Sequence, residues 1–423
     1  MPKTLSKRLL WAALLAANLT AAAFAHEGHE GHGSSEAPAR PSAAVMPAAM
    51  PVAKVALGIG VAADAQGGLW LARVEEGRVK VSVSRDGGAS FSTPVAVNPT
   101  PENIYADGEN RPKLQVLADG TVYVSYTQAL AKPYSGMIRF AVSRDGGRSF
   151  SAPVTINDDG EGSHRFDSLV ADDSGTVVIA WLDKRDGVAA ARQGGSYTGS
   201  AVYYAVSRDG GRSFAANRKL ADHSCECCRV GLAVDRDGTP LALWRHIFGR
   251  NTRDFALARL PLAADQPPQA PLRVTDDDWA VDACPHHGGD LAVDGAGRYH
   301  LLWFTLGSTR QGLYYRRSED GGKTFSAPLA IGDFDAQAGH PALLAQGERL
   351  LIVWREFAGD AFRLRLMESR DGGQHWSAPR QVAQVSGPAD YPRLLAQPQG
   401  PLLVWNTRDQ GVQLIAVDAG GAR

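Results

Sequence analysis

The cysteines of this chain lie in two short segments whose residue types could bind a soft metal ion. HSCECCR spans residues 223–229 and DACPHHGGD spans residues 282–290. Thiolate and imidazole ligands of this kind suit Cu(I) and Zn(II). The candidate ligands are Cys225, Cys227, Cys228, Cys284, His286 and His287, with His340 in the following repeat. We predict a copper site here, with zinc as the alternative.

The same four cysteines allow two other states. Two disulfides would suit an even number of cysteines in an oxidising compartment. However, Cys227 and Cys228 are adjacent, which limits unstrained pairing, and a large domain has little need of disulfides. Thiol redox chemistry is the third interpretation. A count of free thiols together with the metal content would separate the three.

The first 25 residues have the pattern of a secretory signal peptide. Lys3, Lys7 and Arg8 precede an apolar run at 9–17, and small residues lead to the sequence AFA at 23–25. The run is shorter than the roughly 20 residues that span a bilayer, so no transmembrane segment is expected. We predict export to the periplasm, with secretion as the alternative.

Residues 26–50 form a leader rich in His, Ala and Pro, which we expect to be disordered. Cleavage after residue 25 would leave His26 first, where an α-amine and an imidazole can together chelate Cu(II). His29 and His32 would add two more nitrogen ligands. The alternative is a solvated tail that binds metals only adventitiously.

A repeat of the form Ser-x-Asp-Gly-Gly-x-x-aromatic occurs five times in the remainder of the chain. Its copies begin at Ser84, Ser143, Ser207, Ser318 and Ser369. The aspartate can accept backbone N–H groups within a tight turn, and the glycines permit positive φ. A group that recurs in most repeats is better explained by a repeated turn than by catalysis. The long gap between the third and fourth copies indicates one repeat without the motif.

A second repeat is a hairpin that ends in a large aromatic residue. Six clear copies end at Tyr126, Trp181, Trp244, Trp303, Trp354 and Trp405, and a weaker one contains Trp70. Periods of this length suit four short strands, the unit of a propeller blade. We therefore predict an all-β chain in which residues 51–423 form a β-propeller of about seven four-stranded blades, with six as the alternative. Residues 52–56 would complete the last blade and close the ring.

These turns resemble the Asp-box, or bacterial neuraminidase, repeat of β-propellers, over nearly all of the chain after residue 51. The resemblance implies the turn and the architecture but not one activity, because the family includes sialidases, other glycosidases, assembly factors and receptors. It makes a sialidase-like hydrolase or glycan-binding protein the alternative function. Arg111, Arg165 and Arg229 would then bind a carboxylate, and Tyr391 with Glu356 would form the nucleophile pair. A structural network around the channel is the other interpretation of these arginines.

The charge balance argues against a nucleic-acid partner. The formal net charge is -1, whereas nucleic-acid binding needs a concentrated basic face. The leading hypothesis is periplasmic copper binding through the Cys/His cluster and the His-rich leader; whether the protein is an enzyme is left open, and a sialidase-like glycosidase is the form it would then take. A third hypothesis is a scaffold that docks an envelope protein.

Overall fold

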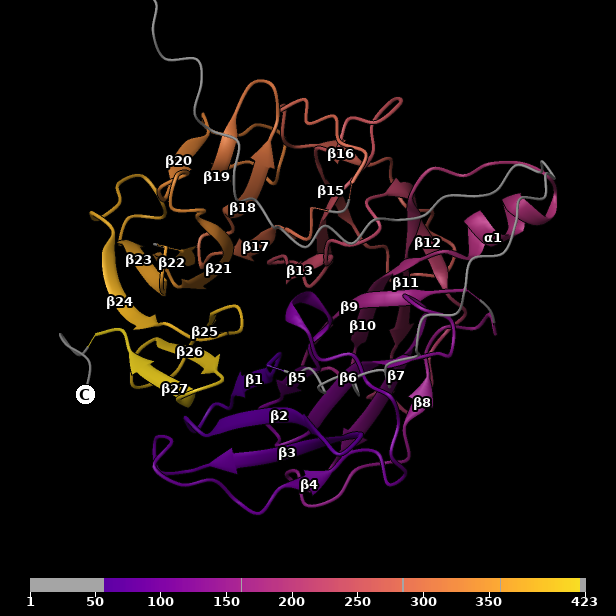
Figure 1. Cartoon of the computed structure of the whole chain (residues 1–423). Coiled ribbons are helices and arrows are strands. Elements are labelled where there is room, and N and C mark those ends of the chain that lie inside the picture. Colours follow the sequence, from indigo (N-terminus) through magenta and orange to yellow (C-terminus); the bar gives the residue numbers. More distant parts are fainter. Residues whose placement is uncertain (1–56, 161, 284, 358, 419–423) are drawn as a thin grey trace, which may run out of the picture. The chain divides into compact units, whose positions relative to one another are not determined.

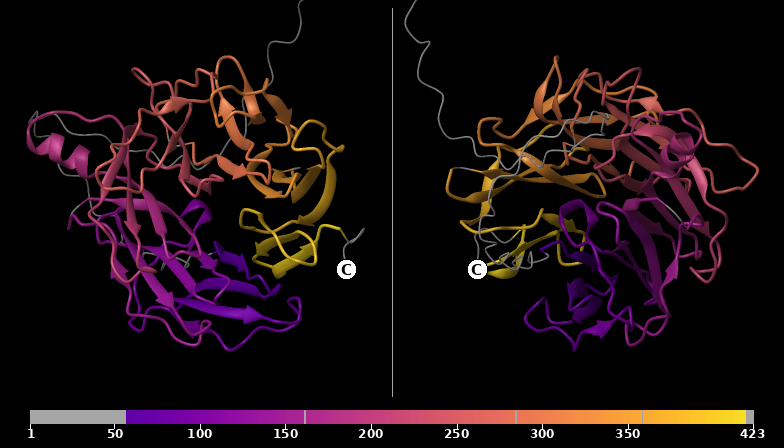
Figure 2. Two further views of the ribbon diagram at one scale, coloured as in Figure 1. Left: turned by 180° about the vertical axis from the view of Figure 1, so that it is seen from behind. Right: turned by 45° about the vertical axis from the view of Figure 1, so that its right-hand side comes forward.

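The structure is a computed structural model that describes residues 57–418 except 161, 284 and 358. The predicted signal peptide at 1–25, the leader at 26–50 and the expected closing strand at 52–56 lie outside these residues. The described chain folds almost entirely into antiparallel sheets arranged in a ring (Figure 1). Figure 2 shows the same ring from behind and turned by 45°.

The first four blades are four-stranded sheets whose strands follow sequence order from the centre outward. Blade 1 contains β1 (Gly60–Ala63), β2 (Leu69–Glu75), β3 (Arg78–Ser84) and β4 (Val95–Ala96). Blade 2 contains β5 (Lys113–Val116), β6 (Val122–Ala129), β7 (Gly136–Ser143) and β8 (Val154–Thr155). Blade 3 contains β9 (His164–Ala171), β10 (Val177–Asp183), β11 (Ser200–Ser207) and β12 (Arg218–Ser224). Blade 4 contains β13 (Gly231–Val234), β14 (Pro240–Arg245), β15 (Phe255–Arg259) and β16 (Leu272–Arg273).

The last three blades continue the pattern. Blade 5 contains β17 (Asp290–Val293), β18 (Tyr299–Leu306), β19 (Gln311–Ser318) and β20 (Leu329–Ile331). Blade 6 contains β21 (Gly339–Gln346), β22 (Arg349–Phe357), β23 (Phe362–Ser369) and β24 (Arg380–Val385). Blade 7 contains β25 (Arg393–Leu395), β26 (Leu402–Thr407) and β27 (Gly411–Ala416) as its described strands. Two helices lie in connections: η1 (Gly108–Asn110) before β5 and α1 (Arg185–Arg192) between β10 and β11.

The innermost strands surround the centre of the ring. Each first strand contacts the first strand of the next blade, and β25 contacts β1, so the ring is closed. The prediction of a seven-bladed β-propeller is confirmed, and the alternative of six blades is wrong. Because neighbouring strands are antiparallel, the start of each first strand lies beside the end of the second strand. We call the face that these ends form the channel face.

The core lies between blades and is organised by one large aromatic residue on each second strand. These residues are Trp70, Tyr126, Trp181, Trp244, Trp303, Trp354 and Trp405, and each is 2% exposed or less. The second strand β10, for example, is buried at every position, because residues on both of its faces pack against neighbouring blades. The aromatic end points of the predicted hairpins are therefore the residues that fill the gaps between blades.

Five turns between third and fourth strands share one set of hydrogen bonds. After β7, Ser143 Oγ donates to Asp145 Oδ1 at 2.8 Å and accepts from the Gly147 N–H at 2.8 Å. Asp145 Oδ1 also accepts from the Ser149 N–H at 2.9 Å. The equivalent pairs are Ser84–Asp86, Ser207–Asp209, Ser318–Asp320 and Ser369–Asp371. These aspartates are used within the turns, and blade 4 is the blade between two copies that lacks the motif.

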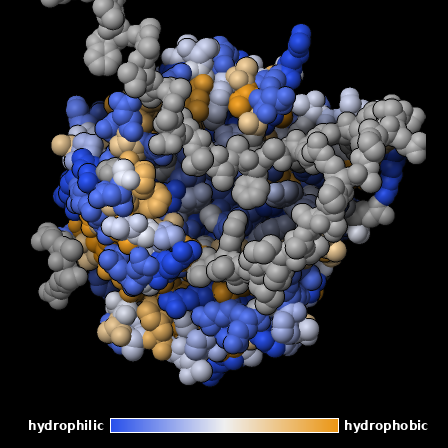
Figure 3. All heavy atoms as spheres, viewed as in Figure 1, coloured by the Kyte–Doolittle hydropathy of each residue, from blue (hydrophilic) through white to orange (hydrophobic). Residues whose placement is uncertain are grey.

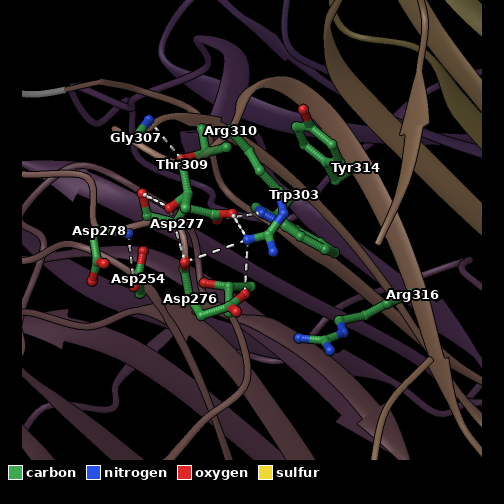
Figure 4. Close-up of polar contacts among 12 residues, drawn as sticks. Asp254, Asp276, Asp277, Asp278, Trp303, Gly307, Thr309, Arg310, Tyr314 and Arg316 are labelled. Carbon is green, nitrogen blue, oxygen red and sulfur yellow. Dashed lines mark hydrogen bonds and ion pairs between the residues drawn. The ribbon is translucent and has the colours of Figure 1, made fainter. Parts of the chain in front are cut away.

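Most of these buried aromatic residues donate a hydrogen bond to an acidic residue at the channel face. Trp181 Nε1 donates to Asp183 at 2.8 Å, and Trp354 Nε1 donates to Glu356 at 2.7 Å. Figure 4 shows the pair in blade 5, where Trp303 Nε1 donates to Asp277 at 2.7 Å. In blade 4, by contrast, Trp244 Nε1 is buried and has no acceptor among the described residues.

The visible outer surface is mostly hydrophilic. In Figure 3, hydrophobic residues of the described chain show as small separate areas on this face. None of the described helices is long and apolar enough to cross a membrane.

Candidate functional site

Three cysteines converge in the loop between β12 and β13. The Sγ atoms of Cys225 and Cys227 are 3.9 Å apart, and those of Cys225 and Cys228 are 3.8 Å apart. All three residues are buried, at 3% exposure or less, in the core between blades 3 and 4. The Cys225 N–H donates a hydrogen bond of 2.9 Å to the Arg245 carbonyl, which connects the loop to β14. The three sulfurs face one another at distances that exclude a disulfide bond between them.

Two buried arginines lie beside these sulfurs without carboxylate partners. Arg253 Nη1 is 3.4 Å from Cys225 Sγ, and Arg253 Nε donates to the Asn251 side chain at 3.2 Å. Arg245 donates to the backbone carbonyls of Arg253, His287 and Phe304. Arg245 is 1% exposed and Arg253 is 9% exposed. Within the described chain, no carboxylate pairs with either guanidinium, and both lower the pKa of the Cys225 thiol by their charge.

The cysteines differ in their acidity. Hydrogen bonds from Cys227 and Cys228 lower the pKa of the Cys225 thiol well below its usual range, assisted by Arg245 and Arg253 and opposed by burial. Burial raises the pKa of the Cys228 thiol. The Cys225 thiol is therefore more acidic than the Cys228 thiol, and its Sγ accepts from the Cys228 S–H.

The predicted histidine ligands do not join this group. His286 is exposed, and its backbone has a positive φ of 52°. His287 stacks between Phe304 and His340, with ring centroids 4.0 Å and 4.3 Å away. Among the described residues, the sulfur group contains the three cysteines alone. Cys284, His26, His29 and His32 lie outside the described residues.

A row of stacked rings crosses three consecutive blades at the channel face. His340 continues from His287 and stacks on Tyr391, with ring centroids 3.6 Å apart and planes inclined by 8°. Burial lowers the pKa of His287 to about 3 and that of His340 well below its usual value, so both imidazoles are neutral at pH 7. Burial also raises the pKa of Tyr391 to about 12. The Nδ1 atoms of both histidines are buried and have no hydrogen-bond partner in the described part of the chain.

Two of the three arginines of the carboxylate-binding hypothesis, Arg111 and Arg229, line one cavity at the centre of the ring, where each is paired with acidic residues. Arg111 forms two hydrogen bonds of 2.8 Å with Asp390. Arg229 pairs with Glu109 at 3.3 Å and with Asp290 at 3.6 Å. The Arg165 guanidinium lies over the rings of Tyr105, Tyr134 and Phe166. In this arrangement the first two are neutralised by acidic residues and the third is covered by aromatic rings.

Glu356 and Tyr391 face different neighbours. Glu356 Oε1 accepts from Trp354 Nε1, and Glu356 Oε2 is 3.8 Å from Arg365. The residue that lies against Tyr391 is Arg355, whose guanidinium is 5.1 Å from the ring centroid. Successive residues of a strand point to opposite faces, so Arg355 and Glu356 cannot both face Tyr391.

A pocket of about 450 Å³ opens beside this row of rings, between blades 5 and 6. Its walls include His287, His340, Arg355, Phe304, Phe334 and Phe362. In the sequence, Arg355 lies at the end of a predicted second strand. No pattern in the sequence indicates that the three phenylalanines lie beside it. They come from the end of β18, the loop after β20 and the start of β23.

Two acidic groups near the channel face are already balanced by arginine. Asp159, His164 and Asp183 lie close enough to share a cation, but the Arg185 guanidinium is 3.0 Å from Asp159 and 2.8 Å from Asp183. In the loop of Figure 4, Arg310 Nη1 donates to Asp276 at 2.8 Å and to Asp277 at 3.0 Å. Arginine therefore occupies the position that a metal cation would take in both groups.

The fold and these sites define a seven-bladed β-propeller with a buried thiol cluster and a channel-face pocket. No protein-family model matches the chain, and no curated protein is similar to it in sequence. The chain is similar in structure to a protein of unknown function from Dyadobacter fermentans DSM 18053, with 16% identity, a TM-score of 0.52, and coverage of 75% of this chain and 95% of that one.

Two polysaccharide lyases are also similar in structure. One is an ulvan lyase bound to a GlcA(1-4)Rha3S chain, with 13% identity, a TM-score of 0.51, and coverage of 85% of this chain and 94% of that one. The other is the polysaccharide lyase Uly1, with 11% identity, a TM-score of 0.51, and coverage of 87% and 91%. At these identities the likeness supports the fold alone.

Proposed function

We propose that this protein binds a soft metal ion, Cu(I) in the first place and Zn(II) as the alternative, through Cys225, Cys227 and Cys228. The observation that carries the proposal is the pair of buried arginines beside the three sulfurs. A buried charge without a partner costs several kcal/mol, so buried cations are normally paired with anions. A metal bound by thiolates is an anionic group that balances Arg245 and Arg253, whereas neutral thiols or disulfides would leave both arginines unbalanced.

The spacing of the sulfurs supports the same proposal. With a metal–sulfur distance of about 2.3 Å, the sulfurs of a site lie about 3.8 Å apart in a tetrahedron and about 4.0 Å apart in a trigonal plane. The separations of 3.8 Å and 3.9 Å in the structure fall within this range. Soft thiolates and a dry setting between two blades favour Cu(I) over harder ions.

The remaining predicted ligands belong to this proposal as expectations. Cys284 would supply a fourth sulfur, because its segment joins β16 to β17 in the blade after the cluster. His26, His29 and His32 would bind Cu(II) after export to the periplasm and cleavage of the signal peptide after residue 25. A Cu(II)-binding N-terminus and a Cu(I)-binding core would together make the protein a copper-binding factor of the envelope.

Metal content and thiol count on the same sample test the proposal. Protein purified from the periplasm under anaerobic conditions should carry copper, or bind one Cu(I) per chain in competition with a Cu(I) chelator. The double variant Cys227→Ser/Cys228→Ser should lose tight binding while its circular dichroism stays unchanged. His286→Ala is the matched control, because that side chain is exposed and outside the sulfur group. A wild-type protein with free thiols and no affinity for Cu(I) or Zn(II) would disprove the proposal.

A glycan-directed function is the second candidate, and the structural comparisons favour it. Two of the similar structures are polysaccharide lyases by name, one of them bound to a uronate-containing chain. The channel face here combines arginine, tyrosine and neutral histidine beside an open pocket. Incubation with ulvan and other acidic polysaccharides should then release oligosaccharides, and a fluorogenic sialoside tests the sialidase-like form. If no polysaccharide is bound or cleaved, this second function is excluded.

A further inference from the structure

The pocket between blades 5 and 6 has the composition of a small-molecule site. Its volume of about 450 Å³ lies within the usual range of ligand pockets, roughly 300–1,000 Å³. Phenylalanine rings form much of its wall, and Phe334 at its mouth is 48% exposed. An exposed aromatic ring beside a concave apolar surface is typical of a site that stacks a ring-shaped ligand.

Arg355 supplies the charge in this pocket. Its guanidinium is held between two rings, 4.4 Å from the centroid of Phe362 and 5.1 Å from that of Tyr391. Its Nη1 donates to the Ala389 carbonyl at 3.2 Å. No carboxylate of the described residues forms an ion pair with it. The N–H donors of the Arg355 guanidinium are thus held in place, and they lack the anionic partner that a half-buried arginine normally has.

The two imidazoles supply neutral hydrogen-bonding groups. A neutral imidazole has one donor and one acceptor nitrogen, which suits hydroxyl groups. His287 and His340 both leave a buried Nδ1 atom without a partner. Their rings stack nearly parallel, with planes inclined by 14°. The nitrogen lone pairs of the two imidazoles lie in nearly parallel planes and do not converge on one metal ion. Hydroxyl groups therefore fit these histidines better than a metal ion does.

The backbone at His340 is strained in a way that aims its side chain. His340 has φ of +51°, in the left-handed region that residues other than glycine seldom occupy. The strain coincides with a β-bulge, because the β21–β22 register shifts between Gly339 and Ala342. Such bulges redirect side chains next to functional sites, and strained residues gather there.

We propose that this pocket binds a uronic acid residue of a polysaccharide, with the carboxylate on Arg355, the sugar ring against the phenylalanines, and its hydroxyl groups on His287 and His340. The inference rests on the second function above and assigns it a site and a substrate class. A neutral sugar would leave the Arg355 charge unbalanced, and a phosphate or carboxylate without a ring would leave the aromatic wall uncovered.

Calorimetric titration with an oligosaccharide of GlcA(1-4)Rha3S and with its carboxyl-reduced form tests the proposal. The wild-type protein should bind the acidic form at least about tenfold more tightly than the reduced form, because a charge-assisted hydrogen bond is lost. Arg355→Met should remove that preference. Phe334→Ala should weaken binding of both forms, and its exposed position leaves folding unaffected.

Arg393→Met is the matched control. Arg393 is another arginine without an ion-pair partner in the described chain, but it lines a separate cavity at the centre of the ring with Arg111, Lys113 and Asp290. If Arg393→Met loses binding while Arg355→Met binds fully, the site lies in the central cavity and the proposal is overturned. Absence of binding by the wild-type protein would overturn it too. If polysaccharide binding or cleavage persists unchanged in Arg355→Met and Phe334→Ala, the glycan-directed function stands and only this pocket assignment falls.

Discussion

Arg111 and Asp390 join two blades across the closure of the ring. Their side chains form two parallel hydrogen bonds of 2.8 Å, although the residues are 279 positions apart in the sequence. Arg111 is 5% exposed and Asp390 is 4% exposed. The Asp390 carboxylate also accepts from the Ile59 N–H at 3.4 Å, so this pair connects the first, second and last blades.

We expect Arg111→Met to destabilise the propeller by about 3–5 kcal/mol, because it leaves the buried Asp390 carboxylate without its cation. Arg111→Met/Asp390→Leu should recover part of this loss. Denaturant unfolding measures both variants. Lys80→Met, which removes solvent-screened ion pairs with Glu75 and Glu76, is the control and should change stability far less than Arg111→Met. Equal effects of the buried and exposed substitutions would show that the closure does not depend on this pair.

The two tryptophans of blades 4 and 6 offer a paired test of the aromatic–acid contact. Trp354→Phe leaves Glu356 without its buried donor, whereas Trp244→Phe removes an Nε1 atom that has no acceptor. Both variants lose similar volume. We expect the first to be less stable than the second by about 1–3 kcal/mol, as measured by thermal or urea unfolding. The reverse order would contradict the contact pattern.

The turn after β7 predicts a stabilising role for its serine. Ser143 is 1% exposed, and Ser143→Ala leaves the Gly147 N–H without its acceptor, at a cost of about 1–3 kcal/mol. Ser149 is exposed and Ser149→Ala should cost less than half as much. Comparison of the two unfolding free energies checks the prediction, which fails if Ser149→Ala is the more damaging change.

The half-buried His287 predicts lower stability in mild acid. Burial lowers the pKa of His287 to about 3, against about 6.5 in the unfolded chain. Between these two values the unfolded chain binds a proton that the folded chain does not, so stability decreases as the pH falls below 6.5. This one group contributes up to about 2 kcal/mol between pH 7 and pH 5. His287→Phe keeps the stacking and should reduce the slope, while at pH 7 to 8 the two stability curves should run parallel.

The left-handed backbone of His340 predicts an unusual order of variant stabilities. Glycine accepts φ of +51° without strain, whereas a residue with a Cβ pays roughly 1–2 kcal/mol. His340→Gly should therefore be about 1 kcal/mol more stable than His340→Ala, although both lack the imidazole. Both should lose the same uronate affinity if the imidazole acts in binding. A more stable alanine variant would show that the bulge relaxes when the ring is removed.

Much of the fold follows from the sequence because its signals are local. The box from Ser143 to Phe150 is a contiguous turn, and each hairpin ends in an aromatic residue within about a dozen positions of its own turn. Counting these units yields seven blades. Export, the metal identity and an envelope partner stay predictions, since the leader and Cys284 lie outside the described residues.

The sites depended on contacts that no local pattern specifies. The sequence predicts a cluster of the cysteines with His286 and His287; the sulfurs of Cys225, Cys227 and Cys228 meet, whereas the two histidines do not join them. Arg245 and Arg253 lie beside the cysteines without carboxylate partners. Their position follows from the packing of β14 and the loop after β14 against the cysteine loop. His287, His340 and Tyr391 form one row because the starts of blades 5, 6 and 7 pack side by side, although consecutive members are more than 50 residues apart in the chain. Short-range turn chemistry is encoded in neighbouring residues, whereas the balance of buried charge and the walls of a pocket are decided by which distant strands the packed core places side by side.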